Sequence, residues 1–504
     1  METRFTILSS LVMTLMVATN TWADVQLSNL FTDQMVLQRE LPVPIFGTAS
    51  PGEQVSVSFA GQLQTTLADQ QGNWMVKLAP LKTSGTAQQM VIKAANTIRL
   101  SDILVGEVWL CSGQSNMAGK FSAAKGRSIS PQDLARDHAG FRFCNKNSGW
   151  KSLNEKTQAS CSQVGYFFGM KLYQELGVPI GLIQRATSGT PIQSWMEQSV
   201  AEEIRQELAI PKHWGDPKQP NRAHREYDAW IRPLLPVAFR GVIWYQGERN
   251  AKTQTGWEYQ HLLKRLIESW RKTWATTNGE PLRKFPFYYV QVPSQQQGQE
   301  YPWLRDSMRR VLDTTDNTGM AIFYDHGPDL HPKNKKPSGE RLALWALAKD
   351  YGRSKLVHCG PLLDQVAIVD DKAILSFRHV GGGLQSMAGG PQLSFFEIAG
   401  TDGQYVPAQA SIVGDTVIVQ SGKISSPAFV RYLFWKGEPN AEISLINAEG
   451  LPASSFMTDN LKPVRKSLGI SQSKSTTDRD TKRSTKGKKR DDNRAARRSK
   501  DTDA

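Results

Sequence analysis

The segment from Gly106 to Gly119 carries residue types that could present a reactive hydroxyl. An apolar run ends at Ser112-Gly113, and the polar turn Gln114-Ser115-Asn116 follows it. Ligands of open α/β sheets bind outside the carboxyl ends of the strands, so a serine in such a turn lies where a substrate would bind. Ser115 is therefore a candidate nucleophile, provided that a histidine reaches its hydroxyl.

Ester hydrolysis would require a base beside this serine and a carboxylate that orients the base. His331 is the candidate base, and either Asp329 or Asp325 could orient it. The resulting chain order is Ser, Asp, His. The GxSxG turn of α/β-hydrolases is absent, because Met117 occupies the position of its last glycine.

The same chemistry needs hydrogen-bond donors for the developing oxyanion. The backbone N–H groups of Ser115 and Gly189, with a side-chain amide from Gln246 or Asn250, are candidate donors that follow three different apolar strands. Each residue alone has a structural interpretation: a turn for Ser115, a buried amide for Gln246, a helix N-terminal charge for Glu248. Their joint position at successive strand ends favours a hydrolase.

These side chains must be positioned by a sheet. From about residue 101 to 355, apolar strands such as 240–245 and 285–292 alternate with helical patterns such as 259–274. This alternation predicts βαβ units and a parallel sheet, an α/β fold. We therefore expect an α/β domain over 101–355, between an N-terminal β module at 24–100 and a C-terminal β module at 356–460.

Residues 1–23 have the pattern of a secretory signal. Arg4 precedes an apolar stretch that is too short to span a bilayer, and Thr21-Trp22-Ala23 places small residues before Asp24. A retained N-terminal anchor is the alternative. The pattern predicts a secreted or periplasmic protein.

The basic C-terminal region, 461–504, is expected to be a disordered tail. Within it, residues 471–504 carry twelve lysines and arginines against six aspartates, with no aromatic residue. Such a segment cannot bury enough apolar surface to fold. A solvated tail is the simpler interpretation, and contact with an anionic surface is the functional one. Nucleic acid is not an expected partner of an exported chain.

Four cysteines offer little scope for a framework of disulfides or metal sites. Cys144 and Cys161 could pair in an exported protein, although nothing in the sequence fixes this, and Cys111 fits a buried strand position. No CxxC motif and no zinc-like spacing occurs. We expect neither a metal nor a cofactor.

Over roughly residues 25–459 the chain resembles the sialate O-acetylesterase family of SGNH-type hydrolases. Long ordered motifs carry the resemblance: MVLQRELPVPIFGTASPGEQVSV, GEVWLCSGQSNMAG, VGYFFGMKLYQELGVPIGLI, RGVIWYQGERN, DLHPKNKKPSGERLAL and GLPASSFMTD. The resemblance implies secreted enzymes that remove acetyl groups from sugar hydroxyls. It also implies a three-layer α/β/α core flanked by β-sandwich-like modules.

Carried over by position, the family nucleophile is Ser115, its base is His331 and its carboxylate is Asp329. Two positions depart from the family pattern. Ser188 replaces the first glycine of a GGT sequence, which would cost free energy if that position required a positive φ. Arg249 replaces a small residue, which would place a cation near the site or pair it with Glu248.

The substrate interpretation follows from the resemblance. We expect an acetylated sialic acid as substrate, with Arg249, Glu248 and Asn250 as candidate substrate-contacting residues. One alternative is an esterase acting on plant or algal polysaccharide. Another is a glycan-binding protein whose catalytic site the departures at Ser188 and Arg249 have disabled.

Overall fold

The computed structural model describes residues 24–121, 138–146, 148–210, 223–293, 300–323, 325, 329–434 and 445–463. They belong to one compact unit that ends at Pro463. The signal-like segment 1–23 and the basic region beyond Pro463 lie outside the described residues.

The first β module is continuous with the central sheet. Its strands are β1 (Gln26–Leu27), β2 (Val36–Gln38), β3 (Val43–Thr48), β4 (Gln54–Phe59), β5 (Gln62–Leu67), β6 (Asn73–Leu78) and β7 (Ser84–Lys93). The next strand, β8 (Thr97–Gly113), pairs with β2 and β7 in its first part and with the central strands in its last part. The boundary expected between residues 100 and 101 therefore falls inside one strand.

The central elements alternate as the sequence predicts. The strands are β9 (His138–Cys144), β10 (Trp150–Leu153), β11 (Ile180–Ala186), β12 (Gly241–Tyr245), β13 (Phe287–Gln291) and β14 (Thr318–Ile322). The helices are α1 (Ser115–Ala118), α2 (Gln163–Leu176), α3 (Gln198–Glu207), α4 (Glu248–Lys252), α5 (Tyr259–Asn278), α6 (Tyr301–Thr314) and α7 (Lys336–Lys349).

These strands form a largely parallel sheet in the order β10-β9-β11-β8-β12-β13-β14. The five pairings from β9 to β14 are parallel, and only β10 runs antiparallel to its neighbour. The chain is thus a mixed α/β protein. Strand β8, which ends just before Ser115, lies inside the sheet between β11 and β12.

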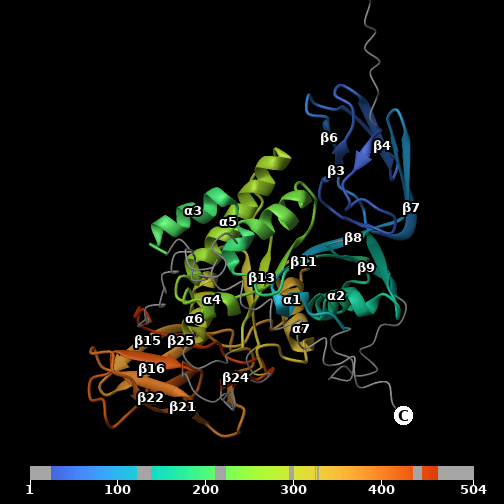
Figure 1. Ribbon diagram of the computed structural model, residues 1–504. Helices are drawn as coiled ribbons and strands as arrows, with labels where there is room; N and C mark the ends of the chain where they lie inside the picture. The colour runs from blue at the N-terminus through green and yellow to red at the C-terminus, as the bar shows by residue number, and fades with distance from the viewer. Residues whose placement is uncertain are drawn as a thin grey trace, which may run out of the picture. The chain divides into compact units, whose positions relative to one another are not determined.

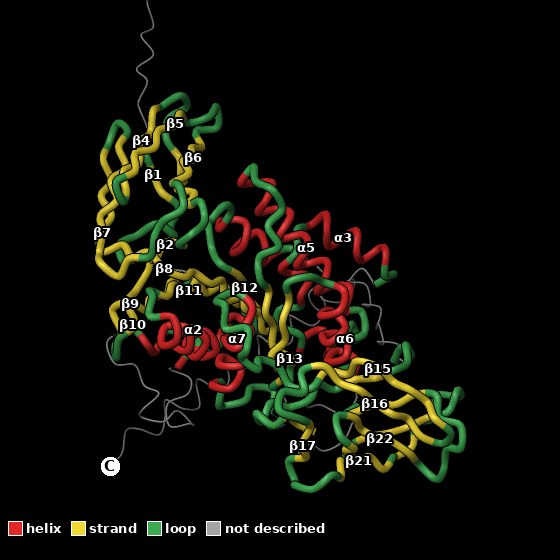
Figure 2. Tube along the Cα trace, turned by 180° about the vertical axis from the view of Figure 1, so that it is seen from behind, coloured by secondary structure: helices red, strands yellow, loops and turns green. Residues whose placement is uncertain are grey.

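Helices cover both faces of this sheet. On β13, the ring of Tyr288 lies 6.2 Å from that of Trp345 on α7, whereas the next residue, Tyr289, donates its hydroxyl to Met308 O of α6 at 2.7 Å. Since successive strand residues point to opposite faces, α6 and α7 lie on opposite sides. Figures 1 and 2 show α2 beside α7 on one side and α5 beside α6 on the other.

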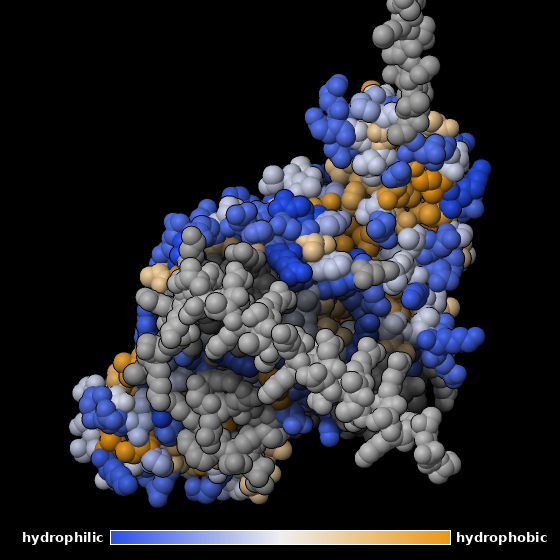
Figure 3. Space-filling view, in the orientation of Figure 1, coloured by the Kyte–Doolittle hydropathy of each residue, from blue (hydrophilic) through white to orange (hydrophobic). Residues whose placement is uncertain are grey.

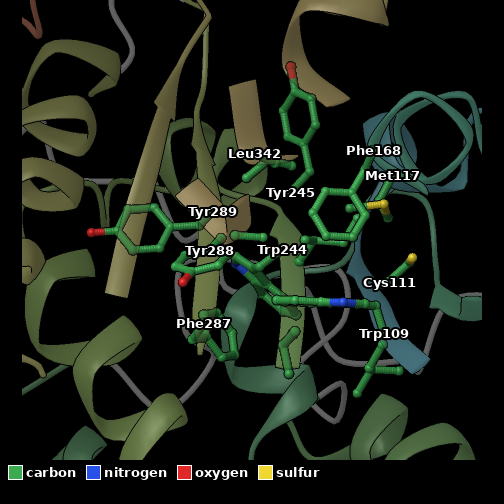
Figure 4. Packing of buried hydrophobic residues seen from close by; sticks show 14 of the residues in the cluster. Trp109, Cys111, Met117, Phe168, Trp244, Tyr245, Phe287, Tyr288, Tyr289 and Leu342 are labelled. Atoms are coloured by element: carbon green, nitrogen blue, oxygen red, sulfur yellow. The ribbon is translucent and has the colours of Figure 1, made fainter. Parts of the chain in front are cut away.

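The core around β8 is aromatic. Trp109 is fully buried and its ring lies 5.0 Å from Phe168 of α2 in an edge-to-face arrangement. Figure 4 shows Cys111 and Met117 on the same side of the sheet as Phe168. Helix α2 is held in place by its caps, because Ser162 accepts from Gly165 N and Gly177 ends the helix with a φ of 63°.

The outer side of the opposite layer is polar. Arg265 on α5 contacts Glu203 and Glu207 of α3 at 3.3 and 2.6 Å. Figure 3 shows hydrophilic side chains over α3 and α5, as expected for amphipathic helices that bury one face.

The second β module packs on α6. Its strands are β15 (Leu362–Val369), β16 (Lys372–Arg378), β17 (Leu384–Ser386), β18 (Gln392–Leu393), β19 (Phe396–Ala399), β20 (Val406–Pro407), β21 (Gln409–Val413), β22 (Thr416–Gln420), β23 (Phe429–Tyr432), β24 (Leu445–Asn447) and β25 (Phe456–Met457). The buried Arg305 of α6 donates to Leu433 O at 2.7 Å and to Ser455 Oγ at 3.1 Å. Gln291 at the end of β13 donates to Ser454 Oγ at 2.8 Å.

Two further observations concern membranes and disulfides. No helix among the described residues has both the length and the apolar character needed to cross a membrane. All four cysteines are buried and free, including Cys144 and Cys161.

Candidate active site

The turn that carries Ser115 is fixed by the strands on either side of β8. Gly113 has a φ of 133°, and a Cβ there would lie 2.2 Å from Tyr245 O of β12. Gln114 N donates to the same carbonyl at 2.9 Å, and Thr187 N, just after β11, donates to Gly113 O at 3.0 Å. Only glycine combines this φ with this close approach, so Gly113 lets the chain leave the sheet and begin α1 at Ser115.

The structure brings Ser115 and His331 together across 216 residues of chain. His331 Nε2 lies 2.9 Å from Ser115 Oγ. Ser115 is half-buried and His331 is exposed, so both atoms can meet a substrate. This is the geometry in which an imidazole takes the proton of a serine hydroxyl.

The surroundings of His331 favour its neutral imidazole. Burial lowers the pKa of His331 below its ordinary value, and the positive charge of Lys335 lowers it further. A neutral imidazole is the form that can act as a base.

The two candidate carboxylates lie in different surroundings. Asp325 forms a two-point ion pair with Arg341, at 2.7 and 2.5 Å. Asp329 is exposed, and its charge raises the pKa of Lys335. Within the described residues, no hydrogen bond joins Asp329 to His331, so the orienting role stays a prediction.

Asn116 connects the nucleophile turn to the loop of the base. It is 1 % exposed, and its amide nitrogen donates to Glu248 Oε1 and, at 3.0 Å, to Leu330 O, the residue before His331. Its amide oxygen accepts from Lys335 Nζ. Because Asn116 follows Ser115 directly, this one side chain couples the positions of both reacting residues.

Lys335 and Glu248 are two buried titratable side chains that both hydrogen-bond Asn116. Each is 4 % exposed. Burial lowers the pKa of Lys335 to about 7, against the charges of Glu248 and Asp329, which raise it. Burial likewise raises the pKa of Glu248, against the hydrogen bond from Asn116. Glu248 was expected to contact substrate, but its carboxylate instead supports Asn116 from within the protein.

Gln246 and Asn250 also lie inside the protein, in a network of amides. Gln246 is fully buried and its nitrogen contacts Asn250 Oδ1, Thr190 O and Gln114 Oε1 at 2.9, 3.1 and 3.2 Å. Asn250 is fully buried and donates to Gln193 Oε1 and Thr255 Oγ1. Both amides therefore have internal acceptors for the hydrogens that the sequence interpretation assigned to an oxyanion or a substrate.

This network orients Gln114 instead. Gln114 is 4 % exposed, and its Oε1 accepts from Gln246. No acceptor among the described residues is paired with its amide nitrogen. Gln114 therefore has donor capacity on the residue immediately before Ser115.

The loop after β11 contains Ser188, which replaces a glycine of the family motif. The positive φ, 71°, belongs to Gly189, and Ser188 has none. Both residues are exposed. Replacing the first glycine of the motif by Ser188 therefore carries no cost of backbone strain.

Arg249 lies on α4, half-buried, on the β12 side of β8. No cluster of three or more His, Cys, Asp or Glu with the arrangement of a metal site occurs in the described part of the chain.

Sequence reasoning missed Gln114, Asn116 and Lys335 as parts of the site. Gln114 and Asn116 flank the candidate nucleophile, so their position was a usable signal. The only sequence signal for Lys335 was its position four residues after the candidate base. That position does not reveal that its ammonium group is buried.

Comparison with known proteins finds a family that is similar to the central part of the chain. A sequence model of the family described as carbohydrate esterase, sialic acid-specific acetylesterase, matches residues 105–322. The matched segment contains Ser115, Gly189 and Gln246 and ends before His331.

Relatives extend the similarity beyond that segment. Sialate O-acetylesterase from Homo sapiens is 29 % identical over 417 residues, covering 71 % of this chain and 78 % of the relative. The corresponding protein from Pongo abelii gives the same identity and coverage over 418 residues. The crystal structure of a carbohydrate acetylesterase from Xanthomonas citri is 32 % identical, with a TM-score of 0.76, covering 87 % of this chain and 100 % of that one.

Proposed function

Because the chain belongs to the sialic acid-specific acetylesterase family of carbohydrate esterases, we propose that Ser115 and His331 hydrolyse O-acetyl esters of sialic acids. Membership makes the protein a carboxylic ester hydrolase that acts on O-acetyl esters. The observation that carries the assignment of residues is the 2.9 Å contact between Ser115 Oγ and His331 Nε2.

The proposed reaction has two halves. Ser115 Oγ attacks the acetyl carbonyl carbon while His331 Nε2 accepts the hydroxyl proton, and collapse of the tetrahedral intermediate transfers that proton to the departing sugar oxygen. Water then attacks the acetyl-enzyme, giving its proton to His331. His331 returns a proton to Ser115 as acetate leaves.

For the oxyanion, we propose the N–H groups of Ser115 and Gly189 and the amide of Gln114. Gln114 replaces Gln246 in this role, since the Gln246 amide is buried among internal acceptors. Gln246 then acts by holding Gln114 through its 3.2 Å contact. Each well-placed donor of this kind contributes about 3–4 kcal/mol to transition-state stabilisation.

The mechanism is tested by removing the reacting groups in the full chain. With an aryl acetate, Ser115→Ala and His331→Ala should each lower kcat by about 10³-fold or more. Ser112→Ala is the matched control, because that serine is buried three residues earlier and its hydroxyl has no hydrogen-bond partner among the residues that the structure describes. Near-normal turnover by folded Ser115→Ala would refute the assignment.

Asp329 is proposed as the carboxylate of a Ser-His-Asp triad. It is exposed, so solvent weakens its field at the imidazole. We therefore expect Asp329→Asn to lower kcat by about 10–100-fold. This is less than the loss of about 10⁴-fold that follows the same substitution of a buried triad carboxylate. A loss as large as that of His331→Ala would show that Asp329 makes a direct hydrogen bond during the reaction.

The substrate alternative is acetylated plant or algal polysaccharide. A panel that measures acetate release from acetylated sialic acids and from acetylated xylan separates the two. The non-catalytic alternative loses its main argument, since Ser188 does not occupy the positive-φ position. Failure of an organophosphate to label Ser115, with glycan binding retained, would revive it.

We also propose export by cleavage after Ala23, which rests on the sequence pattern of residues 1–23. N-terminal sequencing of the exported protein should read from Asp24.

A further inference from the structure

A pocket of about 400 Å³ lies beside the nucleophile turn and has no role in the proposed chemistry. It opens at the carboxyl edge of β8, β9 and β11, and its walls include Ala118, Lys120, Lys146 and Lys151. Arg249 follows β12, which flanks β8 on the other side. We call this cavity the lysine pocket.

The lysine pocket is positively charged. Three lysines line it, and the described residues of its lining include no Asp or Glu. Lys120 is exposed and Lys151 is half-buried, and neither ammonium group has a hydrogen bond or ion pair with the described residues. An anion that entered the pocket would meet these charges without first displacing a carboxylate.

Lys146 is partly balanced from one side. Its ammonium group donates to Thr187 Oγ1 and lies 3.9 Å from Glu226 Oε2. Burial lowers its pKa to about 8, and the nearby charge of Arg185 lowers it further, against Glu226. Glu226 thus partly balances Lys146, whereas no ion pair among the described residues balances Lys120 or Lys151.

The lysine pocket adjoins both parts of the reacting site. Ala118 lies three residues after Ser115 in α1, so their Cβ atoms are about 5–6 Å apart on one helical turn. Lys146 binds Thr187, which lies two residues before Gly189. A sugar held in the pocket would therefore be next to the nucleophile and next to the loop of a proposed oxyanion donor.

We infer that the lysine pocket binds the carboxylate of an acidic sugar residue whose acetyl ester is presented to Ser115. The inference rests on the proposed function and adds to it the residues that select an anionic substrate. The pocket is large enough for one monosaccharide, given that small-molecule sites measure about 300–1,000 Å³. The inference assigns the positive charge that selects an acidic sugar to Lys120, Lys146 and Lys151 instead of Arg249.

The test compares acidic with neutral esters in the full chain carrying Lys120→Met and Lys151→Met. For an acetylated sialic acid and an acetylated uronic acid, kcat/KM is measured against that for an acetylated neutral sugar. The ratio of acidic to neutral kcat/KM should fall by about 100-fold in the double variant, mainly through KM, as expected when binding energy common to ground state and transition state is removed. Lys120→Arg with Lys151→Arg should restore most of the ratio, because the charge is kept.

Lys171→Met is the matched control, since that lysine is paired with Glu175 on the outer side of α2 and should leave the ratio unchanged. Raising the salt concentration should lower the ratio in the parent chain more than in the double variant. A fall confined to sialic or to uronic esters identifies the source of the carboxylate, and either result supports the inference.

An unchanged ratio, or an equal loss on acidic and neutral sugars, would overturn the inference. Failure of the proposed function is a separate result. In that case Ser115→Ala fails to abolish hydrolysis. Calorimetry would still detect the pocket, because the Ser115→Ala variant should bind free sialic acid and the added substitutions Lys120→Met and Lys151→Met should weaken that binding.

Discussion

At the scale of single residues, the site depends on side chains that do not touch the ester. Asn116 holds the turn of Ser115 and the loop of His331 through Leu330 O, and it hydrogen-bonds the buried side chains of Glu248 and Lys335. The dyad geometry is thus set by an amide that the sequence presents as an ordinary turn residue.

Asn116→Ala should lower kcat for an aryl acetate by about 100-fold with little change in KM, because a displacement of about 1 Å between reacting groups costs that much. The organophosphate labelling rate of Ser115 should fall in parallel. Asn154→Ala, which removes an amide that bonds only within its own turn after β10, is the control and should leave labelling unchanged. A variant that lost stability but labelled at the normal rate would contradict a positioning role.

The charge of Lys335 should also set the acid limb of activity. The pKa of His331 is lowered by burial and by Lys335, so the neutral base persists below its ordinary value of about 6.5. Lys335→Met removes one lowering influence and raises the pKa of His331. The acid limb of kcat/KM should then move to higher pH.

The matched control for this pH profile is Lys333→Met, which removes an exposed lysine from the same loop. Solvent screens the charge of this lysine, so the acid limb of kcat/KM in Lys333→Met should coincide with that of the parent chain. A limb that stays in place in Lys335→Met would show that burial alone lowers the pKa of His331.

At the scale of elements, the end of β8 is where backbone geometry and chemistry meet. Gly113 and Gly177 both have positive φ, but only Gly113 has another backbone within contact distance of its missing Cβ. Gly177→Ala should destabilise the fold by about 1–2 kcal/mol and leave kcat intact. Gly113→Ala should cost more and also lower kcat, because the contact with Tyr245 O must open and move Ser115.

Chemical denaturation together with kcat of the folded fraction checks this pair of glycine variants. Equal stability losses in the two variants, with kcat unchanged in both, would contradict the argument from close approach.

The elements also show what the sequence could and could not predict. Strands 240–245 and 285–292 were identifiable because buried parallel strands are continuous apolar runs. The continuity of β8 was not, since its first part alternates in burial and its last part is fully buried. Likewise, Ser115 and His331 were identifiable by type and loop position, but the inward turn of Gln246 and Asn250 depends on partners far away in the chain.

At the scale of the whole molecule, the second β module is bound into the α/β part through buried polar contacts. Gln291 and Arg305 direct their hydrogen bonds to Ser454, Ser455 and Leu433. Without residues 356–463, these buried donors would lose partners, at a cost of about 1–3 kcal/mol each and more for the charged arginine.

Two truncations test this dependence. A chain of residues 24–355 should fail to give a soluble folded protein, whereas a chain of residues 24–463 should retain the parent Tm and aryl acetate activity. The second expectation follows because the compact unit ends at Pro463. Thermal unfolding and kcat measure both, and a cooperative, active 24–355 chain would contradict the assigned role of the second module.

The four buried cysteines can report local unfolding of this molecule. Burial raises the pKa of Cys161 and of Cys359 to about 12, so neither thiol reacts at neutral pH until its surroundings separate. Cys111 and Cys161 adjoin the reacting edge of the sheet, and Cys359 lies where the second module begins. The order in which a thiol reagent modifies them would show whether the catalytic edge or the module junction opens first, with no label added to the chain.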